Sequence, residues 1–434
     1  MGELKARSQL DRERRIMDRK EMTSRSMRLR VTASALVALL PMTQSWAKNP
    51  TLDLSLTRRG EYLATAANCT SCHSEPGAAP FAGGVKFTTQ FGTIYSTNIT
   101  PDRETGIGRW TEEQFRRAMR EGIRPNGEHL YPAFPYTAFT KLTDSDVSAI
   151  FAYLKTLPAT RARAPKNQLS FPFNQRWLLG AWKRLFFEDN RFATDAGRSA
   201  EWQRGAYLVE ALGHCGACHT PRNFLGAERA SAALTGGTYL DTIAGGRIRP
   251  WSAVNLTPAP SGLGSWSVDE IKAYLKTGSN AYATSFGPMN DVIMNSTRHL
   301  SDADLRAVAI YLKGLSPKEQ DTGPKADNDV LGEGEALYDT HCATCHLPTG
   351  KGSIETGPAL AGNPVVQAAD AASLINVILS GPELPNPPPV QRTRMEPYEG
   401  SLSDAEIAAL ASFLRSTWGH RSGAVSADQV AAQR

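Results

Sequence analysis

The sequence has little of several features that would define a class of function. Beyond residue 47 it has no apolar run of the roughly 20 residues that a membrane-spanning helix needs. Residues 48–434 also have no net charge, with 38 Lys/Arg and 38 Asp/Glu, so nucleic-acid binding has no electrostatic footprint. There is no nucleophile–base constellation, and the Gly-rich stretches lack the strand–helix context of a phosphate loop or flavin site. No catalytic residue is assigned.

Residues 27–47, MRLRVTASALVALLPMTQSWA, have the pattern of a secretory signal peptide. Arg28 and Arg30 form the charged start, about ten apolar residues follow, and Ser45-Trp46-Ala47 supplies a small–x–small cleavage site. A membrane anchor is the alternative, but the apolar stretch is too short to span a bilayer. We expect cleavage near Ala47 and an exported chain that is soluble or peripheral.

The sequence has only six cysteines, and all of them lie in three copies of the pattern C-x-x-C-H. This pattern is the attachment signature for c-type haem. Its two thiols share one face of a helical turn and can form thioethers with the haem vinyl groups, while the histidine ligates the iron. We therefore predict three covalently attached haem c groups, bound by Cys69, Cys72, Cys215, Cys218, Cys342 and Cys345, with His73, His219 and His346 as iron ligands.

Two other uses of a C-x-x-C pair are disulfide exchange and zinc binding. Neither needs a histidine directly after the second cysteine, and neither explains three repeats that use every cysteine of the chain. His214 and His341 each precede the first cysteine of a motif, and we expect them to be surface or packing residues.

The repetition extends beyond the motifs, which indicates an array of related units. Upstream of each motif is a short helical segment with a glycine: Gly60, Gly205 and Gly334. Downstream, each copy ends in an amphipathic helix that opens on Ser or Thr followed by Asp, a favourable helix start. These helices are LTDSDVSAIFAYLKTLP, LSDADLRAVAIYLKGLSP and LSDAEIAALASFLRSTWG. The glycine would let the first helix cross the last one closely.

We predict an all-α chain of three tandem class I cytochrome c-like domains joined by linkers. Units of about 90–110 residues have marginal apolar cores, so each haem would supply much of its core. The expected boundaries are a signal peptide and extension at 1–47, unit one at 52–160, a linker at 161–197, unit two at 198–318, a linker at 319–327, unit three at 328–420 and a tail at 421–434.

The second iron ligand differs among the units. Met289 and Met395 precede the last helices of units two and three, and a thioether opposite a histidine raises the haem potential. Met294, closer to the helix, is the alternative to Met289. In unit one, GEHLYPAFPYTAF has Phe134 in this position, and a benzyl ring has no lone pair for iron. Either His129 ligates this haem or its iron is five-coordinate.

The linker between units one and two is rich in large apolar residues. We favour helix packing between the units, and a membrane-facing or partner-facing patch is the alternative. The residues are Trp177, Leu178, Leu179, Trp182, Leu185, Phe186 and Phe187.

Longer segments resemble one family. GHCGACHTPRNFLGA (213–227), NITPDRETGIGRWTEEQFRRAMREG (98–122), NLTPAPSGLGSWSVDEI (255–271) and PALAGNPVVQAADAASLINVILSG (358–381) resemble triheme cytochrome c subunits of membrane-bound bacterial alcohol, gluconate, sorbitol and aldehyde dehydrogenases. The resemblance implies a subunit that accepts electrons from a catalytic subunit of flavin, pyrroloquinoline quinone or molybdenum type. Its acceptor would be membrane ubiquinone, a terminal oxidase or another cytochrome.

Position by position, the resemblance makes His73, His219 and His346 proximal ligands and Met289 and Met395 distal ones. It implies a periplasmic location with peripheral attachment to the cytoplasmic membrane. Phe134 departs from the YPAMPY form of the alcohol dehydrogenase members, whereas YPAFPY resembles the form of other members, so this site differs either by branch of the family or by loss of the ligand. The departure leaves one alternative function. That alternative is a multihaem peroxidase-like enzyme that uses an open iron in unit one; we expect the carrier rather than this enzyme.

Overall fold

The structure is a computed structural model that describes residues 54–243, 246–353, 355–385, 390 and 393–434. The expected signal peptide at residues 27–47 lies outside the described residues. None of the helices in the described ranges combines the length and the apolar character of a membrane-spanning segment. The described residues form one compact body.

Unit one contains five helices and two strands. They are α2 (Leu54–Ala66), α3 (Cys69–His73), β1 (Lys86–Thr89), β2 (Gly92–Tyr95), α4 (Glu112–Glu121), α5 (Tyr136–Phe139) and α6 (Asp144–Leu154). The linker after unit one adds β3 (Gln168–Leu169) and α7 (Leu178–Phe186).

Unit two repeats this order with additions. Its elements are α8 (Ala200–Tyr207), the π-helix η1 (Leu208–Leu212), α9 (Gly216–His219), η2 (Ala230–Ala232), β4 (Gly237–Thr242), β5 (Ile248–Ala253), α10 (Val268–Thr277), α11 (Met289–Asn295), η4 (Thr297–His299) and α12 (Asp302–Lys313). Unit three contains α13 (Asn328–His341), α14 (Ala343–His346), α15 (Ala372–Ser380) and α16 (Asp404–Ser416). In the tail, α17 (Ala427–Ala431) packs on α16.

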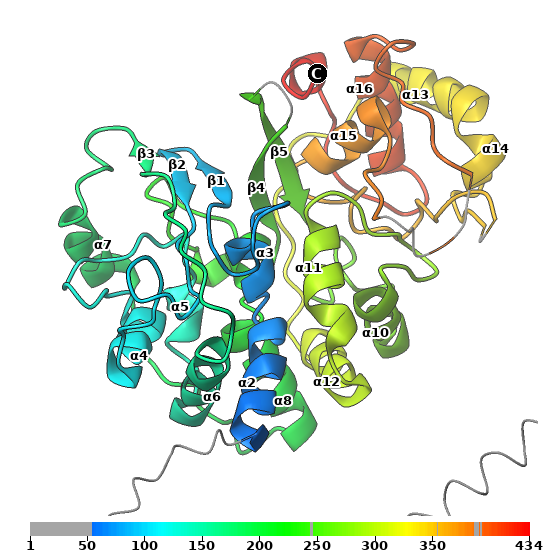
Figure 1. Ribbon diagram of the computed structural model, residues 1–434. Coiled ribbons are helices and arrows are strands. Elements are labelled where there is room, and N and C mark those ends of the chain that lie inside the picture. The colour runs from blue at the N-terminus through cyan, green and yellow to red at the C-terminus, as the bar shows by residue number, and fades with distance from the viewer. Residues whose placement is uncertain (1–53, 244–245, 354, 386–389, 391–392) are drawn as a thin grey trace, which may run out of the picture. The chain divides into compact units, whose positions relative to one another are not determined.

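In each unit the first helix crosses the last helix at a glycine, as predicted (Figure 1). The crossing pairs are α2 with α6, α8 with α12, and α13 with α16. A Cβ atom would lie 1.9 Å from a carbonyl oxygen of the facing helix at Gly60, 2.0 Å at Gly205 and 2.3 Å at Gly334. The two backbones are therefore in contact, and any side chain would have to separate them.

The starts of the three last helices are also as predicted. The side chains of Thr143, Ser301 and Ser403 each accept a hydrogen bond from a backbone N–H of the first turn. In unit three, Glu406 returns a bond to the backbone of Ser403 and completes a capping box. These caps fix where each last helix begins, and so where the first helix crosses it.

Helices dominate the described residues, but the all-α prediction holds only in part, because these residues also contain two small antiparallel sheets. One has the order β1-β2-β3, and the other is the hairpin of β4 and β5. The segment KFTTQFGTIY that forms β1 and β2 is rich in Thr, Phe, Tyr and Ile around a glycine turn, a composition typical of a hairpin. Such short strands give no helical periodicity.

The buried residues divide the body into two cores. Units one and two share one continuous apolar cluster that includes Leu63, Val147, Leu212 and Leu305. Unit three has a separate cluster around Leu410. The sequence predicted three similar domains in tandem. In the structure, units one and two share one core, and unit three has a core of its own.

Candidate haem-binding sites

Each C-x-x-C-H segment forms a short helical turn that ends on its histidine: α3, α9 and α14. In all three turns the histidine Nδ1 forms a hydrogen bond with a backbone carbonyl oxygen. Because a carbonyl oxygen can only accept, Nδ1 must carry the proton and donate it. The distances are 2.7 Å from His73 to Thr97, 2.7 Å from His219 to Val254 and 2.8 Å from His346 to Pro358. This bond fixes the tautomer whose lone pair is on Nε2, the form that a proximal iron ligand requires.

In units one and two, the segments NITP and NLTP hold the carbonyl that orients the histidine. Asn98 accepts from the backbone N–H of Thr100 at 2.9 Å and donates to the carbonyl of Thr160 at 2.7 Å. Asn255 accepts from Thr257 at 2.9 Å and donates to the carbonyl of Lys318 at 2.7 Å. Each asparagine thus ties the loop after the carbonyl to the chain beyond the last helix. The NITP and NLTP segments lie in the stretches that resemble the known family, but the resemblance did not predict this role of their asparagines.

The paired thiols of each motif lie close together in a partly buried setting. Burial, with a smaller contribution from the second thiol of the motif, raises the pKa of Cys69 and of Cys215 to about 12. The same two causes raise the pKa of Cys342 to about 11. This setting disfavours the thiolate that zinc binding or disulfide exchange requires, whereas a thioether carries no charge. The residues therefore fit attached haem.

No group of three or more His, Cys, Asp or Glu side chains that could hold a metal ion occurs within the described ranges. A structural zinc site needs four such ligands.

The structure separates the two candidate methionines of unit two. Met289 is the first residue of α11 and is half-buried. The sulfur of Met294 is 3.1 Å from a guanidinium nitrogen of Arg298, which donates to it. The Met294 thioether is therefore already engaged, which favours Met289. In unit three, Met395 is half-buried in an irregular segment, and its carbonyl oxygen approaches Gly381.

Phe134 and His129 of unit one are packed in different places. The Phe134 ring is half-buried and meets the Phe139 ring edge-on, with centroids 5.5 Å apart. The imidazole of His129 lies under α7, where a Cβ on Gly180 would be 3.3 Å from Nε2. Its Nδ1 is buried, with no hydrogen-bond partner among the described residues. Burial and the nearby charge of Lys183 lower the pKa of His129.

The attachment turns of units one and two lie close to each other. Burial raises the pKa of Cys72 to about 11, and the nearby Cys218 of unit two adds to this rise. Ser71 accepts a hydrogen bond of 2.9 Å from Asn295 of α11. The helix that begins with Met289 therefore packs on the motif turn of unit one.

A reciprocal contact joins the two units. Asp146 in α6 accepts from Arg59 of its own unit at 2.6 Å and from the hydroxyl of Tyr207 in unit two at 2.5 Å. The Tyr207 hydroxyl in turn accepts from the backbone N–H of the helix cap Thr143, at 3.2 Å. Donors from two units thus share one buried carboxylate.

The same arrangement occurs with the units exchanged. Asp304 in α12 accepts from Arg204 of its own unit at 2.8 Å and from the hydroxyl of Tyr62 in unit one at 2.6 Å. The backbone N–H of the cap Ser301 donates to the Tyr62 hydroxyl at 3.1 Å. Units one and two therefore form an internal pair with approximate two-fold symmetry. We call these two contacts the reciprocal lock.

Sequence reasoning missed the lock, although a signal was present. The lead-in segments RGEYL and RGAYL carry Arg and Tyr in units one and two, whereas unit three has EGEAL. Helical periodicity identifies Gly and Leu in these segments as packing residues. It does not explain why an Arg and a Tyr recur at positions that periodicity assigns to the surface. Residues that recur in only two of three copies indicate a contact that only two copies make.

Unit three joins unit two through other residues. Ser252 of β5 and Ser373 of α15 each donate a backbone N–H to the other's hydroxyl, at 2.9 and 3.0 Å. The loop before Met289 also reaches unit three, because Gly287 donates to the carbonyl of Glu383 at 3.0 Å. Unit two therefore contacts both other units.

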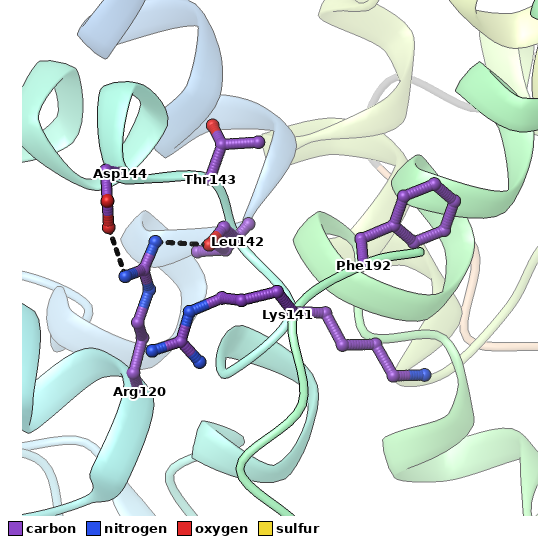
Figure 2. Close-up of a pocket in the computed structure, with 7 residues that line it drawn as sticks. Arg120, Lys141, Leu142, Thr143, Asp144 and Phe192 are labelled. Carbon is purple, nitrogen blue, oxygen red and sulfur yellow. Dashed lines mark hydrogen bonds and ion pairs between the residues drawn. The ribbon is translucent and has the colours of Figure 1, made fainter. Parts of the chain in front are cut away.

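Two cavities lie beside units one and two, and the smaller also borders the linker. The smaller, of about 160 Å³, is lined by Arg120, Lys141, Leu142, Thr143, Asp144, Arg191 and Phe192 (Figure 2). Arg120 reaches Asp144 and the carbonyl of Leu142, and Lys141 pairs with Glu210 at 2.8 Å. The larger cavity, of about 360 Å³, includes His214 and Glu210 in its lining. Because Arg120 and Lys141 are paired with carboxylates, we interpret both cavities as structural junctions.

The fold and the donor sets define a c-type cytochrome, and comparison with known proteins identifies the family. The family model described as cytochrome c matches residues 57–158 and 331–418. The chain is 40% identical over 420 residues to the cytochrome c subunit of the quinone alcohol dehydrogenase of Gluconacetobacter polyoxogenes, covering 93% of this chain and 89% of that one. It is 40% identical over 411 residues to the fructose dehydrogenase cytochrome subunit of Gluconobacter japonicus, covering 86% and 81%.

A subunit of the nicotinate dehydrogenase of Pseudomonas putida is 42% identical over 368 residues, which cover 83% of this chain. The chain spans only 30% of the length of that relative. With these matches, the chain belongs to the family of cytochrome c subunits of bacterial dehydrogenase complexes, whose work is electron transfer.

Proposed function

We propose that the chain is a triheme electron-transfer subunit. It accepts electrons from a dehydrogenase catalytic subunit and delivers them to membrane ubiquinone or another respiratory acceptor. It would act in the periplasm, peripherally attached to the cytoplasmic membrane.

The observation that carries this proposal is the threefold repetition of one donor set. Each unit has two cysteines on one partly buried turn and a histidine whose Nδ1 is tied to a carbonyl. When bound, haem c supplies a one-electron iron couple. The family model matches units one and three, and the glycine crossing and His219 bond of unit two support a third site.

The role of the chain's own residues is to hold three donor sets at fixed separations. The reciprocal lock fixes unit one against unit two, and the contacts of Ser252 and Glu383 fix unit three against unit two. A rigid arrangement suits electron transfer, because the protein supplies orientation and electrostatics rather than bond chemistry. The partner subunit, of flavin, pyrroloquinoline quinone or molybdenum type, would choose the substrate.

A second candidate function depends on Phe134, which supplies no lone pair to iron. A ligand role for His129 would require its ring to leave Gly180, so we expect a five-coordinate iron in unit one. Such an iron could react with peroxide. We keep the carrier as the main proposal, because the relatives are electron-transfer subunits.

Haem content and ligation test both candidates. We expect the purified chain to hold three haems, and low-temperature electron paramagnetic resonance to show two low-spin Met/His centres and one high-spin centre. Met395→Ala should remove one Met/His signal and lower one potential by on the order of 0.1 V, within the ~0.8 V range that axial ligands control.

The outcomes separate the candidates. Three equal Met/His signals would refute our interpretation of Phe134, and fewer than three haems would refute the triheme proposal. Rapid turnover with peroxide would favour the enzyme, whereas slow bleaching together with a co-purifying dehydrogenase subunit would favour the carrier.

A further inference from the structure

The linker between units one and two presents a surface that the haem sites do not use. Nine large apolar side chains are exposed in the described parts of the chain, and five of them gather in or beside this linker. They are Phe171 at 80%, Phe173 at 39%, Trp177 at 71%, Leu185 at 70% and Phe224 at 81% exposure. We call these five residues the linker patch. The expectation that the linker residues pack between the units is therefore wrong for Trp177 and Leu185.

A network of contacts holds the parts of the patch together. The ring of Phe173 lies on that of Phe91 in the turn between β1 and β2, with centroids 4.4 Å apart. The turn that carries Phe224 packs on the same ring, because a Cβ on Gly226 would be 3.1 Å from Phe91. Trp182 of α7 donates to the carbonyl of Leu225 at 3.0 Å. The patch is thus one surface, built on a fixed framework.

The orientation of α7 explains why its apolar residues face outward. Lys183 points inward and is 9% exposed, and its ammonium group donates to the carbonyls of Glu121 and Gly122 at the end of α4. These carbonyls form the negative end of that helix dipole, which favours a cation. The ammonium also lies 4.7 Å from the Tyr136 ring. With Lys183 fixed inside, Leu185 is turned to the surface.

The linker around the patch carries a net positive charge, which favours the binding of anions. Without the inward Lys183, residues 161–197 contain six Lys/Arg against three Asp/Glu, although residues 48–434 as a whole are neutral. Arg184, next to Leu185, is exposed, and Arg176 stacks on Tyr131 beside Trp177. Exposed Trp, Phe and Leu interspersed with Arg and Lys are typical of surfaces that lie in the membrane interface and bind anionic lipid.

We propose that the linker patch is the face by which this chain binds the surface of a phospholipid membrane. The aromatic and leucine side chains enter the headgroup region, and the surrounding arginines bind lipid phosphates. This proposal names the surface that would bring the chain to its membrane acceptor. It rests on the proposed function, in which the chain delivers electrons to that acceptor.

Vesicle sedimentation of the purified haem-loaded chain tests the proposal. We expect the chain to sediment with vesicles of phosphatidylethanolamine and phosphatidylglycerol, and less with phosphatidylcholine. Added salt should weaken the binding, because exposed charges are screened. The variant Phe171→Ser/Trp177→Ser/Leu185→Ser/Phe224→Ser should lose at least tenfold in partitioning, because four apolar contacts are removed.

A matched variant controls for the loss of apolar surface. Leu54 and Ile248 are 67% and 50% exposed and lie outside the linker. Leu54→Ser/Ile248→Ser should bind vesicles like the wild type. Equal loss in both variants, or no binding by the wild-type chain, would overturn the proposal. Protection of the patch by a co-purified dehydrogenase subunit, measured by hydrogen exchange in the intact complex, would also overturn it and assign the patch to that partner.

Failure here can be told apart from failure of the proposed function. Haem content and reduction by a dehydrogenase subunit are measured in solution and do not require vesicles. A chain that holds three haems and is reduced by its partner, yet ignores vesicles, would keep the electron-transfer function and lose the membrane face.

Discussion

Units one and two are joined as a pair, whereas unit three is attached as a neighbour, and three positions per unit account for this difference. Units one and two each have an Arg and a Tyr in the first helix and an Asp in the last, so each carboxylate binds its own Arg and the other unit's Tyr. Unit three has Glu333, Ala336 and Glu406 at these positions. Two glutamates would repel each other, and alanine has no hydroxyl.

The comparison explains why one repeated fold produces two kinds of contact. All three units share the glycine crossing and the histidine–carbonyl bond, which are internal to a unit. The lock residues stand on the same two helices but face outward from the crossing. An internal feature therefore forms in every copy, whereas an external contact forms only where two copies carry matching partners.

The largest expected effect comes from separating the helices at a crossing. Gly60→Val would place three carbons against a backbone that leaves no room even for the first, and we expect a loss of stability of about 4 kcal/mol or more. Because units one and two share a core, hydrogen exchange should rise in α2, α6, α8 and α12 together.

Gly334→Val provides the matched change in unit three. Its helices belong to a separate core, so faster exchange should be confined to α13 and α16. If Gly60→Val left α8 and α12 unaffected, units one and two would not be a cooperative pair.

A smaller effect is expected from removing one carboxylate of the lock. Asp304→Ala leaves Arg204 and Tyr62 without their acceptor, and a hydrogen bond to a charged group contributes about 1.5–3 kcal/mol. We expect a loss of about 3 kcal/mol in the unfolding free energy of the pair, measured by denaturant titration. Glu406→Ala, at the same position in unit three, removes only part of an exposed capping box and should cost about 0.5–1 kcal/mol.

The pH dependence of stability checks the same carboxylate. Although burial opposes it, the hydrogen bonds from Arg204 and Tyr62 keep the pKa of Asp304 below its usual value in the folded chain. A group whose pKa is lowered by folding stabilises above its unfolded pKa, about 3.9 for Asp, and loses this contribution as the pH falls through the folded pKa. Below about pH 4 the wild type should therefore approach the stability of Asp304→Ala; a constant difference would contradict this assignment.

The repeated features of the chain were predictable from sequence, and the features that distinguish its units were not. The glycines, the Ser and Thr caps and the motif turns are local, so their spacing was enough to predict them. Tyr62 and Asp304 are 242 residues apart, and no periodicity connects them. The outward face of α7 was only the less favoured of two interpretations, because an inward lysine reverses the usual expectation for an amphipathic helix.

The smallest expected effect tests whether the lock is truly reciprocal. Tyr62→Phe and Tyr207→Phe each remove one hydroxyl that joins the two units and should each cost about 1 kcal/mol. Because the two contacts share no residue, the double variant should cost the sum of the two within about 0.5 kcal/mol. A double variant that costs no more than either single one would mean that the pair opens as soon as one contact is lost. The shared apolar core predicts additivity, because it holds the units together when either hydroxyl is absent.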